Sequence, residues 1–361
     1  MIQDLSFEMI KDLDSQNMFD IITSFPEQVK DAVIIGEKFD GFPYSPTSIH
    51  FVILGMGGSA IGGDILNSYF SNTEGTKHLI FTTLRNYKLP GYVNKDTNII
   101  ASSYSGGTEE TNSAFEEALK ICKNIICISS GGKITDTAIK NNIPIIKIPS
   151  GYQPRCALGY SFFPMLLSIL KTNMFSEEIK NRIRNEINET IDILRKRANE
   201  YSMISDNNLA ISIATRIKGT IPVIYSSVDG MESVNTRWIR QIQENAKHLA
   251  YGGFLPEMNH NEINGFNLPE GFAKNISIIF IKDINTHPRT LRRFDALQNL
   301  IETDVKQIIT VQSEATSLLA RMFDMIYLGD WVSYYLALLN NTDPTPIPLI
   351  TKLKNYLSQY E

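Results

Sequence analysis

The strongest constraint on the fold is an alternation of short apolar runs with helical patterns that begins near residue 48. Residues 48–54 are mostly apolar and are followed at once by a glycine-rich segment and then by a helical pattern. Apolar strands that alternate with helices are typical of a parallel sheet covered by helices on both faces. The chain is therefore predicted to have an α/β fold.

This alternation occurs twice along the chain. The first set of predicted strands covers residues 48–54, 78–84, 97–102, 124–129 and 143–148, with helices at 59–70, 108–122 and 136–141. After a long charged helix at 176–201, the second set has strands at 221–226, 275–281 and 305–311, with helices at 231–247, 288–302 and 314–340. We therefore expect a helical N-terminal segment (1–45) and two domains (46–203 and 204–361), each a mostly parallel sheet flanked by helices.

Charge and composition exclude several classes of protein. The net charge of −5 does not favour nucleic acid as a partner. Three cysteines form an odd and sparse set, which argues against a disulfide framework and fits a reducing compartment. The five histidines show no ligand spacing with cysteines or with one another, so no metal site is expected.

The first residues carry acids throughout and lack the basic start of a signal peptide. No stretch of about 18 uncharged apolar residues is present, so no membrane span is expected. These features predict a cytoplasmic protein.

A glycine-rich loop, Leu54-Gly-Met-Gly-Gly-Ser-Ala-Ile-Gly-Gly-Asp64, follows the first predicted strand. Its glycines permit a sharp turn, and the helix that follows presents free N–H groups to an anion. The loop formally matches a dinucleotide fingerprint, but that motif requires an acid at the end of the second strand. That strand ends in Thr82-Thr-Leu-Arg85, so no nicotinamide cofactor is expected. A tight turn without a ligand is the other interpretation.

A second loop, Ser102-Ser-Tyr-Ser-Gly-Gly-Thr-Glu-Glu-Thr111, follows the third predicted strand and opens a helix. Carboxyl ends of parallel strands are where ligands bind in such sheets. Several hydroxyl groups and flexible backbone N–H groups suit a phosphate monoester. Because the loop lacks the lysine of a nucleotide-binding P-loop, a nucleoside triphosphate is not indicated. Simple N-capping of the helix is the alternative.

Together the two loops resemble the sugar isomerase (SIS) domain. Three further segments resemble the bifunctional phosphoglucose/phosphomannose isomerases of bacteria and archaea: Gln153-Pro-Arg-Cys-Ala-Leu-Gly159, Arg237-Trp-Ile-Arg-Gln-Ile-Gln-Glu-Asn-Ala-Lys247 and Leu255-Pro-Glu-Met-Asn-His-Asn-Glu-Ile263. The resemblance runs from about residue 45 to the C-terminus. It implies an aldose–ketose isomerase, without a cofactor, that interconverts glucose 6-phosphate and mannose 6-phosphate with fructose 6-phosphate through an enediolate.

The resemblance also implies roles for individual residues. The phosphate would be bound by Gly58, Ser59, Ser103, Ser105 and Thr108. Glu244 would be the base, and Arg155 would stabilise the enediolate intermediate. His260 would assist ring opening, reaching across from the second subunit of a homodimer. A lysine near the C-terminus would line the site, and Lys354 is favoured over Lys352.

Two positions depart from the family pattern. Gln243 stands where the family usually has Asn, and Ser226-Ser227 stands where it usually has Gly-Ser. Neither change removes a proposed catalytic group, but both leave the preference between glucose and mannose substrates open. The alternative function is a non-catalytic SIS module that senses a sugar phosphate. Such a sensor would be expected to carry a DNA-binding helix-turn-helix and a basic face, and the sequence predicts neither.

Overall fold

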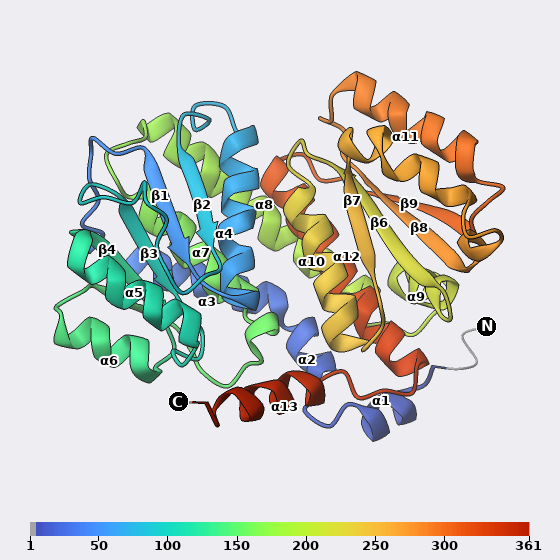
Figure 1. The fold of residues 1–361 in the computed structure, drawn as a ribbon, viewed down its shortest axis with the longest axis horizontal. Helices are drawn as coiled ribbons and strands as arrows, with labels where there is room; N and C mark the ends of the chain where they lie inside the picture. The colour runs from blue at the N-terminus through green and yellow to red at the C-terminus, as the bar shows by residue number, and fades with distance from the viewer. Residues whose placement is uncertain (1–4, 361) are drawn as a thin grey trace.

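Two parallel sheets lie side by side in this protein, with helices between them (Figure 1). The structure is a computed structural model that describes residues 5–360. The helices cover both faces of each sheet, so the predicted α/β class is confirmed.

Both sheets have all their neighbouring strands parallel. The first sheet, in the order β2-β1-β3-β4-β5, contains β1 (His50–Leu54), β2 (Ile80–Leu84), β3 (Asn98–Ser102), β4 (Asn124–Ser129) and β5 (Ile145–Lys147). The second, in the order β7-β6-β8-β9, contains β6 (Ile221–Ser227), β7 (Tyr251–Leu255), β8 (Ile276–Lys282) and β9 (Gln307–Gln312). In each sheet the first strand of the sequence has a neighbour on either side, which is the topology that opens a crevice at the carboxyl ends of the strands.

The helices account for most of the remaining chain. They are α1 (Phe7–Leu13), α2 (Met18–Thr23), α3 (Phe25–Lys38), α4 (Gly57–Asn72), α5 (Glu109–Ile121), α6 (Gly132–Lys140), α7 (Leu158–Leu170), α8 (Glu177–Tyr201), α9 (Leu209–Ile217), α10 (Glu232–Asn245), α11 (Pro288–Ile301), α12 (Leu318–Leu339) and α13 (Pro348–Leu357). Four short 3₁₀ helices are η1 (Pro154–Cys156), η2 (Glu257–His260), η3 (Glu262–Asn267) and η4 (Phe272–Asn275). Among residues 5–360, every helix is too short or too polar to cross a membrane.

The sequence did not predict β7, α7 or α9. β7 contains the pair Gly252-Gly253, and glycine has a low preference for strands, so the segment gives a weak signal. α7 is buried along its whole length and shows no polar face, so its sequence has no clear amphipathic period. The predicted strands agree with the observed ones to within a few residues.

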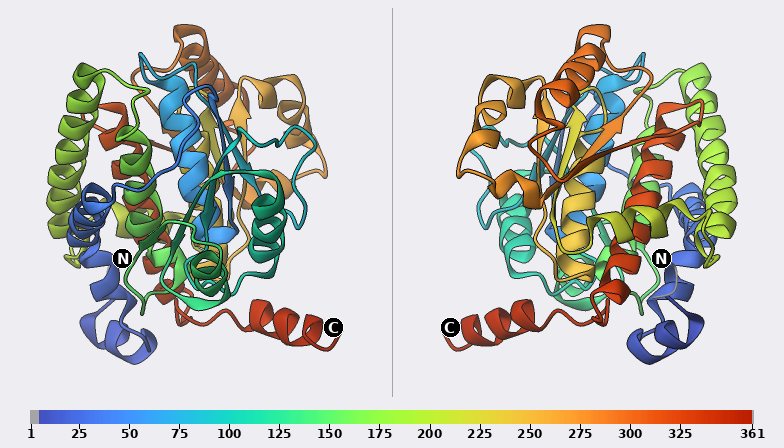
Figure 2. Two further views of the ribbon diagram at one scale, coloured as in Figure 1. Left: turned by 90° about the vertical axis from the view of Figure 1, so that its left-hand side faces the viewer. Right: turned by 90° about the vertical axis from the view of Figure 1, so that its right-hand side faces the viewer.

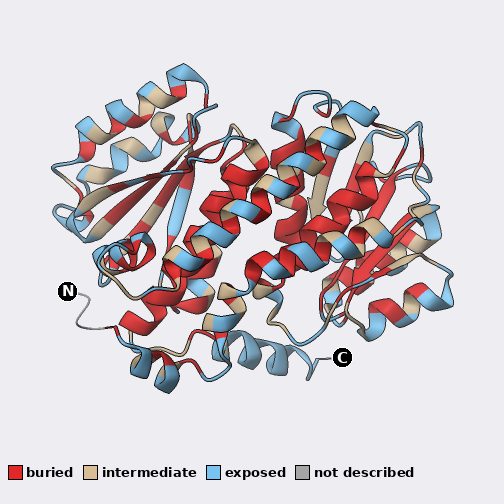
Figure 3. Cartoon of the chain, turned by 180° about the vertical axis from the view of Figure 1, so that it is seen from behind, coloured by how far each residue is buried: buried red, intermediate tan, exposed pale blue. Residues whose placement is uncertain are grey.

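The central helix α12 lies between the two sheets and is buried from Leu319 to Leu339 (Figure 3). It nevertheless carries charged side chains, and a buried charge is tolerated only when it is paired. Arg321 pairs with Asp283 after β8, and Asp324 pairs with Arg197 of α8 at 2.9 Å. These pairs fix α12 to α8 and to the segment after β8.

The N-terminal helices belong to the same packed body. In α3, the side-chain amide of Gln28 donates to the carbonyl oxygen of Cys156 at 2.9 Å and accepts from the N–H of Gly159 at 3.0 Å. In α12, the Tyr327 hydroxyl donates to the carbonyl oxygen of Ile22 at 2.8 Å. Where the two predicted domains divide, within the helices between β5 and β6, stays a prediction.

The last helix, α13, projects from the end of the molecule (Figure 2). None of its residues is buried, and its apolar side chains Leu349, Leu353 and Leu357 are all exposed. An isolated helix of this length is only marginally stable in water. The position of α13 therefore depends on the segment that connects it to the rest of the protein.

Gly329 allows α12 to approach α10 closely, which gives a test of the packing. A Cβ atom at this position would lie 2.5 Å from Trp238, whose ring is fully buried. Gly329→Ala should therefore destabilise the protein by about 1–3 kcal/mol through overpacking, although the same change in an open helix is stabilising. Urea unfolding measures this, with Gly91→Ala in an open turn as the control. A variant as stable as the wild type would contradict the close contact.

Candidate active site

The candidate site lies where the carboxyl edge of the first sheet comes close to the amino edge of the second. Because α10 links β6 to its parallel neighbour β7, it runs back from the carboxyl edge of the second sheet to the amino edge. At the end of α10, Asn245 accepts a hydrogen bond from Arg155 at 2.6 Å. Arg155 in turn lies against the loop after β1, at the carboxyl edge of the first sheet. The candidate site therefore combines the carboxyl edge of one sheet with the amino edge of the other.

The first loop brings the chain close to Arg155. A Cβ atom on Gly58 would lie 2.5 Å from the carbonyl oxygen of Pro154, so only glycine permits this approach. The next residue, Ser59, is buried, and its hydroxyl oxygen accepts a hydrogen bond from the N–H of Tyr104 at 3.0 Å. The two loops that the sequence singles out are thus joined to each other.

The serine-rich loop presents free hydroxyl groups. Thr108 is the N-cap residue of α5, but its side chain makes no capping hydrogen bond, so simple capping does not account for its hydroxyl. The Ser103 hydroxyl donates to the Thr108 hydroxyl at 3.4 Å. Ser105 is exposed and accepts only a long hydrogen bond, 3.4 Å, from the N–H of Gly107. The loop can therefore donate several hydrogen bonds to an anion.

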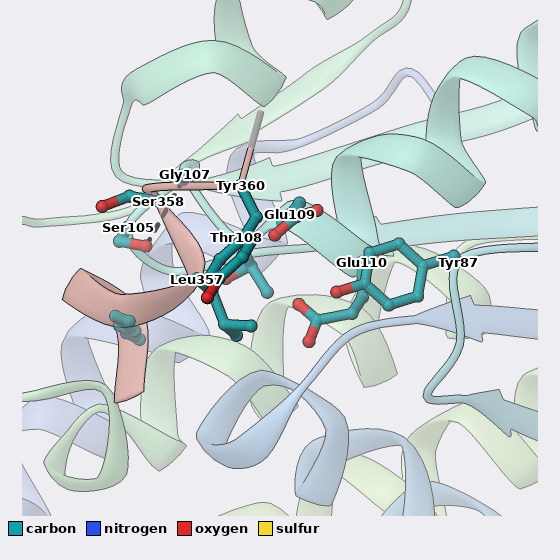
Figure 4. Close-up of a pocket in the computed structure, with 10 residues that line it drawn as sticks. Tyr87, Ser105, Gly107, Thr108, Glu109, Glu110, Leu357, Ser358 and Tyr360 are labelled. Carbon is teal, nitrogen blue, oxygen red and sulfur yellow. Dashed lines mark hydrogen bonds between the residues drawn. The ribbon is translucent and has the colours of Figure 1, made fainter. Parts of the chain in front are cut away.

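A cavity of about 560 Å³ separates this loop from α13 (Figure 4). Ser105 and Thr108 line one side, and Leu357 and Ser358 approach from the other. Lys354 also lines this cavity, which brings a cation of the C-terminal helix to the serine-rich loop. Its predicted role in the site stays a prediction.

Arg155 is buried and makes several hydrogen bonds to the protein. Its Nε donates to Asn245 at 2.6 Å, and its Nη2 donates to the carbonyl oxygens of Pro344 at 2.9 Å and Thr345 at 2.7 Å. Its Nη1 lies 3.7 Å from Oε2 of Glu244. The structure thus brings together two of the residues that the sequence proposed for catalysis.

The two faces of α10 have different surroundings. Arg237, Gln241 and Asn245 point to α12, while Glu244 lines a second cavity of about 460 Å³. The Glu244 side chain is 31% exposed, so a ligand can reach its carboxylate. A carboxylate beside a fixed guanidinium is suited to moving a proton on a substrate whose charge develops nearby.

A buried ion pair holds this arrangement. Arg237 donates to both oxygens of Asp330, at 3.0 and 2.7 Å, and to the carbonyl oxygen of Arg155 at 3.0 Å. Gln241 donates to Asp330 at 2.9 Å. Burial raises the pKa of the Asp330 carboxyl, and the Arg237 guanidinium opposes this shift.

Lys247 connects α10 to the segment that leads into α13. Its Nζ donates to the carbonyl oxygens of Asn245 at 3.0 Å, Asp343 at 2.6 Å and Pro344 at 2.9 Å. Burial lowers the pKa of Lys247 to about 8, and the Arg155 guanidinium adds to this shift. Lys247 and Arg155 share Pro344 as an acceptor, so together they fix the approach to α13.

His260 does not lie near Glu244 within one chain. β7 begins shortly after α10 and runs to Leu255, whose carbonyl oxygen accepts from Val228 after β6 at 3.3 Å. His260 follows at the carboxyl edge of the second sheet and is exposed. Glu244 and His260 therefore lie at opposite ends of α10, a helix about 21 Å long at 1.5 Å per residue.

Three supporting residues were not identified from the sequence: Gln28, Asn245 and Asp330. Asp330 had a detectable signal, because an acid in a long apolar helix must have a buried partner. Gln28 and Asn245 had none, since their contacts join segments far apart in the sequence. For the part of the chain that the structure describes, no group of three His, Cys, Asp or Glu side chains could hold a metal ion.

Solved structures share this fold at low sequence identity. The C-terminal domain of glucosamine-fructose-6-phosphate aminotransferase from Francisella tularensis gives a TM-score of 0.72 at 13% identity, covering 93% of this chain and 99% of that chain. Tagatose-6-phosphate ketose/aldose isomerase from Escherichia coli gives 0.58 at 14% identity, covering 92% of each chain. At this identity the likeness shows that the chain shares the α/β fold of these proteins.

Sequence relatives define the family more closely. A family model described as the bacterial phospho-glucose isomerase C-terminal SIS domain matches residues 206–357. A bifunctional phosphoglucose/phosphomannose isomerase from Caldicellulosiruptor bescii is 38% identical, covering 95% of this chain and 99% of the relative. One from Thermoplasma acidophilum is 34% identical, covering 89% and 94%. The chain belongs to the family of bifunctional phosphoglucose/phosphomannose isomerases.

The environment of Lys247 gives a measurable titration. Its ammonium should titrate near pH 8, well below an ordinary lysine, because burial and Arg155 disfavour the charged form. Glu244→Gln should lower this pKa further, since the Glu244 carboxylate favours the ammonium form. NMR of the lysine Hε and Cε resonances follows both, with exposed Lys95 as the internal control. An ordinary pKa for Lys247 would show that burial and Arg155 do not disfavour its charged form.

Proposed function

We propose that this protein is an aldose–ketose isomerase that interconverts glucose 6-phosphate and mannose 6-phosphate with fructose 6-phosphate. The observation that carries the proposal is the contact between Arg155 and Glu244, whose charged groups lie 3.7 Å apart. This contact lies at the carboxyl edge of the first sheet, where the serine-rich loop follows β3. The names of the family members support the same reaction. No observation favours the alternative of a non-catalytic sensor.

The phosphate would be held by the loops at the carboxyl edge of the first sheet. Ser105 and Thr108 have hydroxyl groups free to donate, and Ser103 lies next to Thr108. Gly58 would contribute its backbone N–H group at the start of α4, where the helix dipole favours an anion, and Ser59 would contribute its hydroxyl group. Lys354 would add a positive charge from across the cavity.

The reaction needs one base and a positive environment. Glu244 would take the proton from C2 of the aldose and return it to C1, while the electron pair moves through an enediolate. In the opposite direction the proton leaves C1 of the ketose. Arg155 would lower the energy of the anionic intermediate, as the sequence resemblance implies.

His260 would come from a second subunit of a homodimer. Glu244 and His260 occupy opposite ends of α10 in one chain, so a single chain cannot bring them together without rearrangement. The segment around His260, residues 251–273, contains three Glu and no Lys or Arg. The receiving site is rich in cations, among them Arg240 and Lys247, so the charges of the two surfaces are complementary.

We also propose a cytoplasmic location. Cys122, Cys127 and Cys156 are all free, which suits a reducing compartment.

The function is tested with the purified protein and with Glu244→Gln. The wild type should convert glucose 6-phosphate and mannose 6-phosphate to fructose 6-phosphate in a coupled assay, with and without a chelator. In Glu244→Gln, kcat should fall by about 10²–10⁴, because an amide cannot act as the base, while KM changes little. The control Glu178→Gln, on the exposed surface of α8, should keep its activity. Normal turnover by Glu244→Gln would refute the assignment.

The shared site is tested by mixing two inactive variants. A heterodimer of His260→Ala and Glu244→Gln subunits would contain one site with both groups intact. Activity should therefore return after the subunits are exchanged, whereas each variant alone stays inactive. Mass spectrometry of the native complexes verifies that heterodimers form. If they form and remain inactive, each site is built within one chain.

A further inference from the structure

A second arginine, Arg240, lies one helical turn before Glu244 on α10. Residues four apart face the same side of a helix, so the two side chains are neighbours. Both line the cavity of about 460 Å³ beside the start of α13. Arg240 is half-buried, so its guanidinium is partly removed from water while it faces this cavity.

Arg240 has no partner within residues 5–360. Its guanidinium makes no hydrogen bond and no ion pair there, whereas Arg237 on the same helix makes three hydrogen bonds. Arg85, which lies nearby, is paired with Asp64. Burial and the like charge of Arg85 lower the pKa of Arg240, and the carboxylates of Asp64 and Glu244 oppose this shift. Because a guanidinium stays charged in proteins, Arg240 is a half-buried cation in need of an anion.

Arg155 has few N–H groups left to stabilise the anionic intermediate of the proposed reaction. A guanidinium has five N–H donors. Arg155 uses Nε for Asn245 and Nη2 for the carbonyl oxygens of Pro344 and Thr345. Only its Nη1 is left, and this atom faces Glu244. Most of the donors of Arg155 thus hold the protein together, while those of Arg240 are free.

We propose that Arg240 is a further catalytic residue that, beside Arg155, donates to the oxygen atoms at the reacting end of the sugar phosphate. This inference rests on the proposed isomerase function. When Glu244 removes a proton from carbon, the electron pair forms the C=C bond and negative charge moves to the former carbonyl oxygen. Arg240 stabilises that oxygen until the proton returns to the neighbouring carbon.

Two inhibitors separate the reacting end of the substrate from its phosphate. 5-Phosphoarabinonate carries a carboxylate where the enediolate has its charge, whereas glucitol 6-phosphate has a neutral hydroxyl there. Both keep the phosphate. Arg240→Gln should weaken binding of the aldonate by about ten- to a hundredfold, because a hydrogen bond to a charged group is lost. It should leave glucitol 6-phosphate unchanged, and kcat should fall by about 10².

Calorimetry gives the two dissociation constants without requiring activity. Arg293→Gln on α11, an arginine of similar exposure on the outer face of the second sheet, is the matched control and should change neither constant. Arg240→Lys, which keeps the charge but loses the planar fork, should retain part of the preference for the aldonate.

The outcomes separate this inference from the proposed function. A wild type that turns over neither substrate and binds neither inhibitor refutes the proposed function itself. An active wild type whose preference for the aldonate survives Arg240→Gln refutes the role of Arg240. If Arg240→Gln and Arg240→Lys weaken the binding of both inhibitors equally, the role of Arg240 is also refuted. The residue would then support the whole site rather than the reacting end.

Discussion

The site depends on the buried ion pair between Arg237 and Asp330. Its desolvation costs several kcal/mol, and the bidentate geometry and the third contact from Gln241 offset that cost. The pair fixes the rotation of α10 on α12, and this rotation decides which side chains face the cavity. Arg237 also binds the carbonyl oxygen of Arg155, so the same contact holds the segment from the first half of the chain.

The opposed orientation of the two sheets determines how the site is assembled. The carboxyl edge of the first sheet supplies the serine-rich loop, but the carboxyl edge of the second points to the other end of the molecule. The second half therefore contributes the end of a helix, with Glu244, instead of a loop at a strand end. The segment that follows β7, including His260, lies on a different surface, which is why we propose that a second subunit uses it.

The sequence predicted the parts of the structure that local patterns encode. The apolar runs predicted both sheets, and the serine-rich loop predicted the candidate anion site. Each of these patterns is contained in a short stretch of the sequence. β7 was not predicted because its two glycines have no side chains and interrupt the apolar pattern that indicates a strand. The partners of Arg155 could not be predicted because Asn245, Pro344 and Thr345 follow it by 90 to 190 residues. The family resemblance named Glu244 and Arg155 as candidates, but it did not show that most N–H groups of Arg155 bind other parts of the protein.

The acceptors of Arg155 have a consequence for synthesis of the chain. The guanidinium is oriented by the carbonyl oxygens of Pro344 and Thr345, which lie 189 and 190 residues later. A nascent chain can close its first sheet and form the serine-rich loop long before those carbonyls leave the ribosome. A fragment that stops before residue 344 would therefore keep the serine-rich loop but lack the two carbonyl oxygens that orient the Arg155 guanidinium.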